Sequence, residues 1–91
     1  MKHAGNAALD RLEPLLAQIR RRGALAERSR GVFYRGGRAF LHFHEHGQEL
    51  FADLRAASEF ERLAVTGAAE RRSFLIRLDA ALASGGAGRR G

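Results

Sequence analysis

GVFYRGGRAFLHFHEHGQELFADLR, residues 31–55, contains three short runs in which apolar and polar side chains alternate, and this stretch decides the fold. The pair Gly36-Gly37 separates the first two runs and is a strong signal for a two-residue hairpin turn, because both central positions need positive φ. A second turn is predicted at His46-Gly47. The stretch therefore predicts three antiparallel strands joined by two hairpins.

The two predicted turns fix which side chains share a face of the sheet. The first turn pairs Phe33 with Phe40, and the second pairs His42 with Phe51. Successive side chains of a strand point to opposite faces, so each turn assigns the residues of the shared middle strand to one face or the other. The two turns give the same assignment. The predicted core face carries Val32, Tyr34, Ala39, Leu41, Phe43, Leu50, Ala52 and Leu54, and the predicted outer face carries Phe33, Arg35, Arg38, Phe40, His42, His44, Phe51, Asp53 and Arg55.

A helix is predicted before this stretch. Asp10 and Glu13 have the spacing of a capping box, Pro14 is expected within the first turn, and Gly23 is expected to end the helix. Residues 1–6 are expected to be loose, and an earlier start at Asn6 would add Leu9 to the apolar side. The apolar positions that recur at helical spacing are Leu12, Leu16 and Ile19.

A fourth strand and a second helix are predicted after the stretch. Residues 60–66 alternate again and place Leu63 and Val65 on the core face. Thr66 is a candidate N-cap for a helix over about residues 67–83, which Gly85-Gly86 would end. The buried side of this helix is predicted to carry Leu75, Leu78 and Leu82.

These elements predict one α+β domain over residues 1–84 and a disordered tail over residues 85–91. The predicted order is α-β-β-β-β-α, a two-layer sandwich in which both helices cover one face of a four-stranded antiparallel sheet. Residues 24–30 lead into the first strand as one extra helical turn or as an irregular link. The opposite face of the sheet has no element left to cover it.

The composition limits the class of protein. The 91 residues include no cysteine, which excludes disulfides and thiolate chemistry, and no apolar run approaches the ~18 residues of a membrane span. The first ten residues lack the apolar segment of a signal peptide. We expect a cytoplasmic protein that does not bind membranes.

The net charge of +6 lies entirely in the first part of the chain. Residues 1–38 hold nine Lys/Arg and three Asp/Glu, whereas residues 39–91 hold seven of each. Such an asymmetry is typical of proteins that bind nucleic acid or another acidic partner. A GC-rich coding sequence, which enriches Arg, Ala and Gly, would give the same composition without a functional reason.

Metal and catalytic chemistry are weakly indicated. His42 and His44 share a strand face and could converge on one ion, but a lone HxHxH with no further spaced ligand does not define a site. We therefore assign no metal ligand, no cofactor and no catalytic residue, and we expect the histidines to be solvated or packed. No nucleophile elbow, Walker sequence or dinucleotide fingerprint occurs, so an enzyme is not expected.

The uncovered sheet face is the predicted binding surface. Aromatic rings interleaved with arginines on an antiparallel sheet are typical of single-stranded nucleic acid binders, in which bases stack on rings and phosphates contact guanidinium groups. A homodimer or another protein partner could use the same face. The predicted partner-binding residues are Phe33, Arg35, Arg38, Phe40, His42, Phe51 and Arg55.

The segment Gly31-Val32-Phe33-Tyr34-Arg35-Gly36-Gly37-Arg38-Ala39-Phe40, between a leading and a closing helix, resembles the MmcQ/YjbR-like proteins, a family of small bacterial domains. Members carry a similar signature of paired strands, glycine, a basic residue, a small residue and phenylalanine. The resemblance implies a frataxin-like (CyaY-like) sandwich and a DNA-binding role. The chain lacks the tryptophan usual near the last strand of that family.

Overall fold

The computed structural model describes residues 1–88. It confirms an α+β fold built on an antiparallel sheet, but the sheet has six strands where four were predicted. Strands β2 to β6 are neighbours in chain order, and β1 pairs with β4 beside them. The elements follow in the order β1 (Lys2–His3), α1 (Asn6–Arg21), β2 (Ala26–Ser29), β3 (Val32–Arg35), β4 (Arg38–His46), β5 (Glu49–Ala56), β6 (Glu59–Ala64) and α2 (Ala68–Gly88).

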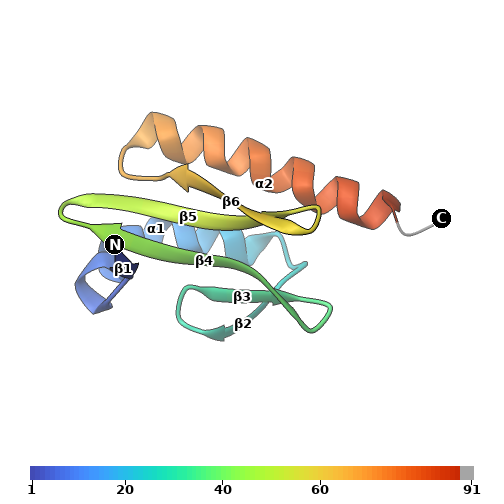
Figure 1. Ribbon diagram of the computed structural model, residues 1–91, viewed down its shortest axis with the longest axis horizontal. Helices are drawn as coiled ribbons and strands as arrows, with labels where there is room; N and C mark the ends of the chain where they lie inside the picture. The colour runs from blue at the N-terminus through green and yellow to red at the C-terminus, as the bar shows by residue number, and fades with distance from the viewer. Residues whose placement is uncertain (89–91) are drawn as a thin grey trace.

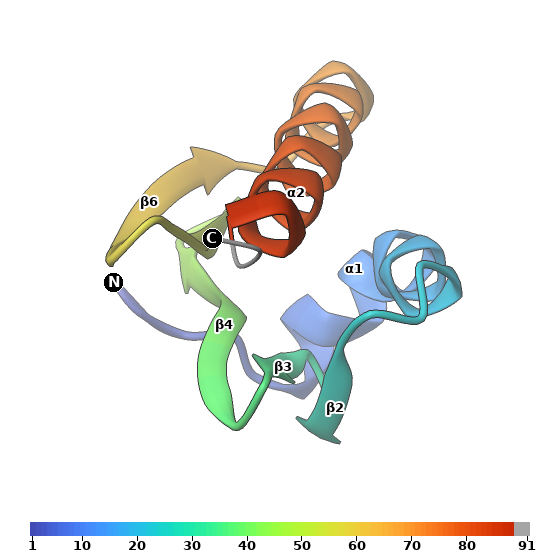
Figure 2. The same ribbon diagram turned by 90° about the vertical axis from the view of Figure 1, so that its right-hand side faces the viewer.

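The molecule has two layers. The sheet curves, and both helices lie on its concave side (Figures 1 and 2), so that the convex side has no helix over it. Among the described residues, neither helix is long and apolar enough to cross a membrane. Sixteen buried apolar residues form the core between the layers: Ala8, Leu9, Leu12, Leu15, Leu16, Ile19, Phe33, Phe40, Leu41, Phe43, Leu50, Ala52, Leu54, Val65, Phe74 and Leu78.

The two strands that were not predicted extend the sheet at different places, β2 beside β3 and β1 beside β4. Residues 26–29, within the segment expected to be helical or irregular, form β2 on the edge beside β3. Lys2 and His3, expected to be loose, pair with Glu45 and His44 at the far end of β4. Because β3 covers only the first part of this edge, the remaining backbone groups of β4 are free to hold β1.

The first hairpin contains a β-bulge that the sequence did not reveal. The Gly36-Gly37 turn and the pairing of Tyr34 with Ala39 are as predicted, and both glycines have positive φ. Phe33, however, pairs with Leu41, so Phe40 is the extra residue of a bulge.

The bulge reverses the alternation of β3 relative to the rest of the sheet. Phe33 is 1% exposed and lies in the core, and Phe40 is 5% exposed, so the prediction that both lie on the outer face is wrong. Arg35 likewise reaches the helix side, where it contacts α2. Val32 and Tyr34, predicted as core residues, are only partly buried, and the Tyr34 ring lies under Arg28.

The second turn lies one residue later than predicted. It consists of Gly47-Gln48 rather than His46-Gly47, and Gly47 takes the positive φ that the turn needs. Strand β5 is therefore shifted by two residues, and His42 lies opposite Asp53 instead of Phe51. A shift of two preserves the alternation, so five predicted core residues of these strands are buried: Leu41, Phe43, Leu50, Ala52 and Leu54.

Helix α1 begins earlier than the capping box indicated. Gly5 occupies the N-cap position without a side-chain cap, and Pro14 lies inside the helix rather than in its first turn. Asp10 accepts a hydrogen bond from Arg30 instead of capping the helix. The predicted end is close to the observed one, because Gly23 follows the C-cap with a φ of 69°.

Helix α2 differs from its prediction at both ends. The Thr66 hydroxyl bonds to the backbone of Leu50, while the Glu70 carboxylate accepts from the amides of Thr66 and Gly67. The helix continues through Gly85-Gly86 to Gly88, so the predicted end is wrong; the rest of the expected tail, residues 89–91, lies outside the described residues. The side chains packed on the core are Phe74 and Leu78, fully buried, and Leu75, Ala81 and Leu82, partly buried.

Replacing Phe33 by alanine tests the corrected placement of β3. We expect Phe33→Ala to lower the free energy of unfolding by about 3–5 kcal/mol, because the ring fills the core. The matched control is Phe60→Ala, which removes a ring that is 40% exposed and should cost about 1 kcal/mol or less.

Urea unfolding followed by circular dichroism measures both values. Should Phe33→Ala fail to fold, Phe33→Leu keeps most of the volume and should still cost more than the control. Equal, small losses for the two phenylalanines would contradict the bulge.

Candidate functional site

The convex face of the sheet carries a group of polar side chains from three strands and β1, which we call the histidine–aspartate cluster: His3, His42, His44, Asp53 and Arg62. Alternation along β4 puts His42 and His44 on this face, and pairing with β1 brings His3 opposite His44. Strand β5 places Asp53 between His42 on one side and Arg62 on the other.

The three imidazoles of the cluster are in contact. The His3 ring stacks on His44 with centroids 4.5 Å apart, and His42 meets His44 edge-on at 5.2 Å. One ring nitrogen from each of the three residues lies within 4.8 Å of the other two. The sequence pattern gave only His42 and His44, because a two-residue strand near the start of the chain has no recognisable signature.

Asp53 is the anchor of the cluster. It is 6% exposed and is the only buried charged residue in the part of the chain whose side chains are described. Arg62 donates two hydrogen bonds to its carboxylate, both of 2.7 Å, and this contact holds the pKa of Asp53 below its ordinary value although burial opposes the shift. A buried carboxylate that accepts a bidentate pair of hydrogen bonds from a guanidinium group remains ionised at neutral pH.

The imidazoles beside Asp53 are held in the neutral form. Burial lowers the pKa values of His42 and His44, and the Asp53 carboxylate only partly opposes this. The Nδ1 atom of His42 and the Nε2 atom of His44 are buried and have no hydrogen-bond partner among the described residues. His44 Nε2 lies 3.2 Å from Asp53 Oδ2, but the contact is not aligned as a hydrogen bond.

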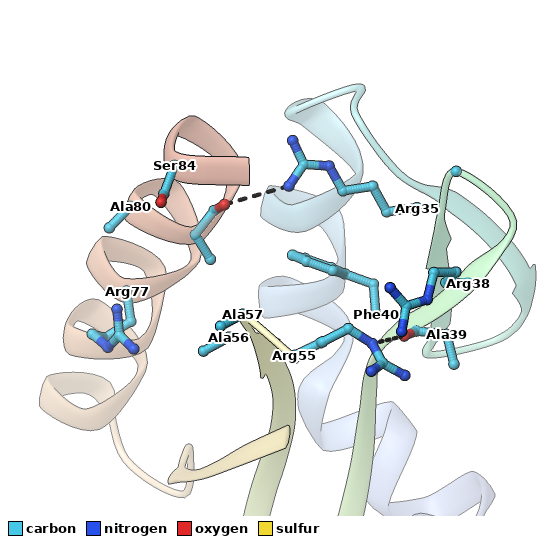
Figure 3. A pocket seen from close by; sticks show the side chains of 12 residues that line it. Arg35, Arg38, Ala39, Phe40, Arg55, Ala56, Ala57, Arg77, Ala80 and Ser84 are labelled. Atoms are coloured by element: carbon cyan, nitrogen blue, oxygen red, sulfur yellow. Dashed lines mark hydrogen bonds between the residues drawn. The ribbon is translucent and has the colours of Figure 1, made fainter. Parts of the chain in front are cut away.

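A second candidate site is a pocket at one end of the sandwich, between α2 and the turns at residues 36–37 and 57–58 (Figure 3). Its volume is about 950 Å³. Phe40 points into it, and its apolar walls are built from alanines. Ala57 at its rim has a φ of 59°, a left-handed conformation that a non-glycine residue rarely adopts.

Four arginines line this pocket, which we call the arginine pocket: Arg35, Arg38, Arg55 and Arg77. Arg35 donates to the backbone carbonyl oxygens of Ala81 and Leu82, at 3.3 and 2.9 Å. Arg55 donates to the carbonyl oxygens of Ala39 and Ser58. These bonds fix the guanidinium groups without neutralising their charge, because their acceptors are carbonyls rather than carboxylates.

The other two arginines differ in their partners. Arg77 forms an ion pair with Glu61 on β6. Within residues 1–84, Arg38 has no carboxylate at ion-pair distance, and its side chain is exposed to water. The described lining of the pocket contains no aspartate or glutamate.

The predicted binding residues therefore separate into three groups. Arg35, Arg38, Phe40 and Arg55 line the arginine pocket, and Phe33 is buried in the core. His42 and Phe51 remain on the convex face, where Phe60 contacts both His42 and Arg55. The continuous surface of three phenylalanines ringed by arginines does not form, because the bulge at Phe40 turns two of the rings inward.

Two of the three consecutive arginines at residues 20–22 form ion pairs within the chain. Arg20 binds the carboxylates of Glu13 and Glu27, and Arg22 binds Asp79 on α2. These ion pairs join α1 to β2 and to the second helix. Cations near the end of α1 also suit the negative end of its dipole.

No protein-family model, curated protein or solved structure matches the chain. The resemblance to the MmcQ/YjbR-like proteins therefore stays a prediction. The function has to be argued from the two sites themselves.

The Asp53–Arg62 contact predicts a pH-dependent contribution to stability. Asp53→Asn should lower the free energy of unfolding at neutral pH by about 1–3 kcal/mol, toward the lower end because the guanidinium is half exposed to water. The pKa of Asp53 is lower in the folded than in the unfolded chain, where it is about 3.9. The contribution is thus complete above that pH and is lost as pH falls through the folded-state value.

Urea unfolding of wild type and variant, at neutral pH and at two acid pH values, measures the difference. Glu49→Gln is the matched control, since it neutralises an exposed carboxylate on the same strand and should change stability by about 0.5 kcal/mol or less. A difference between wild type and Asp53→Asn that does not shrink in acid would contradict the ion pair.

Proposed function

We propose that this protein is a non-enzymatic binding module that takes an anionic ligand with an apolar part into the arginine pocket. The observation that carries the proposal is the described lining of the pocket, which contains Phe40, four arginines and no acidic residue, and in which only Arg77 has a carboxylate partner. Guanidinium groups that hold positive charge without a carboxylate partner favour phosphate or carboxylate groups. A volume of about 950 Å³ lies within the range of small-molecule sites, about 300–1,000 Å³.

The fixed positions of two arginines support the proposal further. Arg35 and Arg55 are already held by backbone carbonyl oxygens, so little side-chain entropy would be lost when an anion binds. Arg38 is free to move toward the ligand. The ring of Phe40, with Arg35 5.5 Å from its centre, offers a surface for the apolar part.

A small anion is favoured over single-stranded nucleic acid as the ligand. Stacking of successive bases needs several exposed rings on the open sheet face. Phe33 and Phe40 are buried and Arg28 lies over the Tyr34 ring, which leaves Phe60 and the partly buried Phe51 for stacking. The phosphate groups of a nucleic acid would still suit the pocket, so this partner remains an outcome of the test, as does a homodimer through the convex face.

Phenyl phosphate is a suitable probe, because it joins an anionic group to an apolar ring. Isothermal titration at low ionic strength should show binding of phenyl phosphate and none of phenol, its uncharged counterpart. Arg38→Ala should weaken the affinity about tenfold, as expected for the loss of one charge-assisted hydrogen bond of about 1.4 kcal/mol. Arg72→Ala, which removes an exposed arginine outside the pocket, should leave it within about twofold of wild type.

Three other results would contradict the proposal. Equal weakening by Arg38→Ala and Arg72→Ala would mean that only net charge attracts the probe. Binding of a short oligothymidine strand, measured by fluorescence anisotropy, without binding of phenyl phosphate would favour nucleic acid. Sedimentation showing a dimer that Phe60→Ala dissociates, with neither ligand bound, would favour the homodimer.

A further inference from the structure

The convex face of the sheet holds a site that the proposed function does not use. The histidine–aspartate cluster lies on the side of the sheet opposite the helices, whereas the arginine pocket lies between α2 and the sheet. We propose that His3, His42 and His44 together bind one divalent transition-metal ion of the kind that prefers imidazole ligands, with zinc as the representative ion. The proposal goes beyond the binding function argued above and does not depend on it.

The geometry of the three imidazoles fits one metal ion. Their candidate ligand atoms lie within 4.8 Å of one another, whereas two nitrogens bound to a tetrahedral zinc at about 2.0–2.1 Å lie about 3.3 Å apart. Side-chain torsions alone can close that difference, because all three residues lie on neighbouring paired strands. The strand positions themselves are fixed by the pairing of β1 with β4.

The hydrogen bonding of the rings gives an independent reason. One nitrogen of His42 and one of His44 are shielded from water and have no partner in the described part of the chain. Buried polar atoms in native proteins almost always have a partner, and exceptions call for a specific explanation such as an ion. The centroids of the three rings also lie 4.5 to 5.9 Å from one another, so the rings bring together nitrogen lone pairs that a cation would bridge.

The residues around the rings supply the outer support that metal sites need. Asp53 lies beside the rings, with its Oδ2 atom 3.2 Å from His44 Nε2, and its carboxylate can accept from an imidazole N–H that does not face the metal ion. Arg62 in turn fixes Asp53 through two hydrogen bonds. Three imidazoles fill three of the four positions around zinc and leave the fourth for water or an external ligand.

The ligand set also indicates which ions would bind. It contains imidazoles and no thiolate, because the chain has no cysteine. Imidazole suits zinc, cobalt, nickel and copper, whereas calcium and magnesium prefer oxygen ligands. Calcium and magnesium are therefore not expected to compete.

Titration of the chelator-treated protein with zinc chloride tests the proposal. Isothermal calorimetry should show one ion per chain with a dissociation constant of about 10 μM or lower, and the melting temperature should rise with zinc concentration. His3→Ala and His42→Ala should each weaken binding at least about tenfold. His46→Ala is the matched control, because it removes an exposed histidine of the same strand that is not in the cluster, and it should leave the affinity within about twofold.

Cobalt gives a second readout that depends on the geometry of the site. The cobalt-loaded protein should show the intense visible absorption of four-coordinate cobalt, and His3→Ala should abolish it. His3 is exposed and lies in a two-residue strand, so its replacement is not expected to unfold the domain. Absence of one-to-one zinc binding, or an affinity unchanged by His3→Ala or reduced equally by His46→Ala, would overturn the proposal.

Discussion

The pairing of β4 with β5 is the constraint on which the rest of the structure depends. Its register sets Leu41 opposite Leu54 and Phe43 opposite Ala52 on the concave side, and His42 opposite Asp53 on the convex side. The first side provides the apolar surface that both helices cover, and the second provides the polar cluster that no helix covers. One register thus fixes both the core and the candidate metal site.

The charged groups of the two candidate sites have different kinds of partner. On the convex face, the buried carboxylate of Asp53 is neutralised by Arg62, whose two hydrogen bonds offset the desolvation cost of a charged group among packed imidazoles. In the arginine pocket, Arg35 and Arg55 are held by neutral carbonyl oxygens, and their positive charge remains available. The bulge at Phe40 connects the two regions, because it turns one ring into the pocket while Leu41 and His42 keep their faces.

The alternation of apolar and polar residues correctly predicted which face of the sheet the side chains of β4 and β5 occupy, because a shift of two residues in the strand pairing leaves these faces unchanged. The core placement of Leu41 and Leu50 and the shared outer face of His42 and Asp53 were therefore correct although the second turn was misplaced. A bulge adds one residue and reverses the alternation, and for that reason Phe33 was placed on the wrong face. His3 joined the cluster through a two-residue strand too short for any pattern, whereas Asp53, a lone acid between apolar neighbours in β5, was a signal of a buried polar site.

Cross-strand nuclear Overhauser contacts in the labelled protein test the central claim, the register of β4 and β5, most directly. We predict contacts between backbone protons of His42 and Asp53 and between those of His44 and Phe51. Contacts between His42 and Phe51 and between His44 and Glu49 would instead show the register set by a turn at His46-Gly47. That result would remove Asp53 from its place opposite His42 and would contradict the cluster.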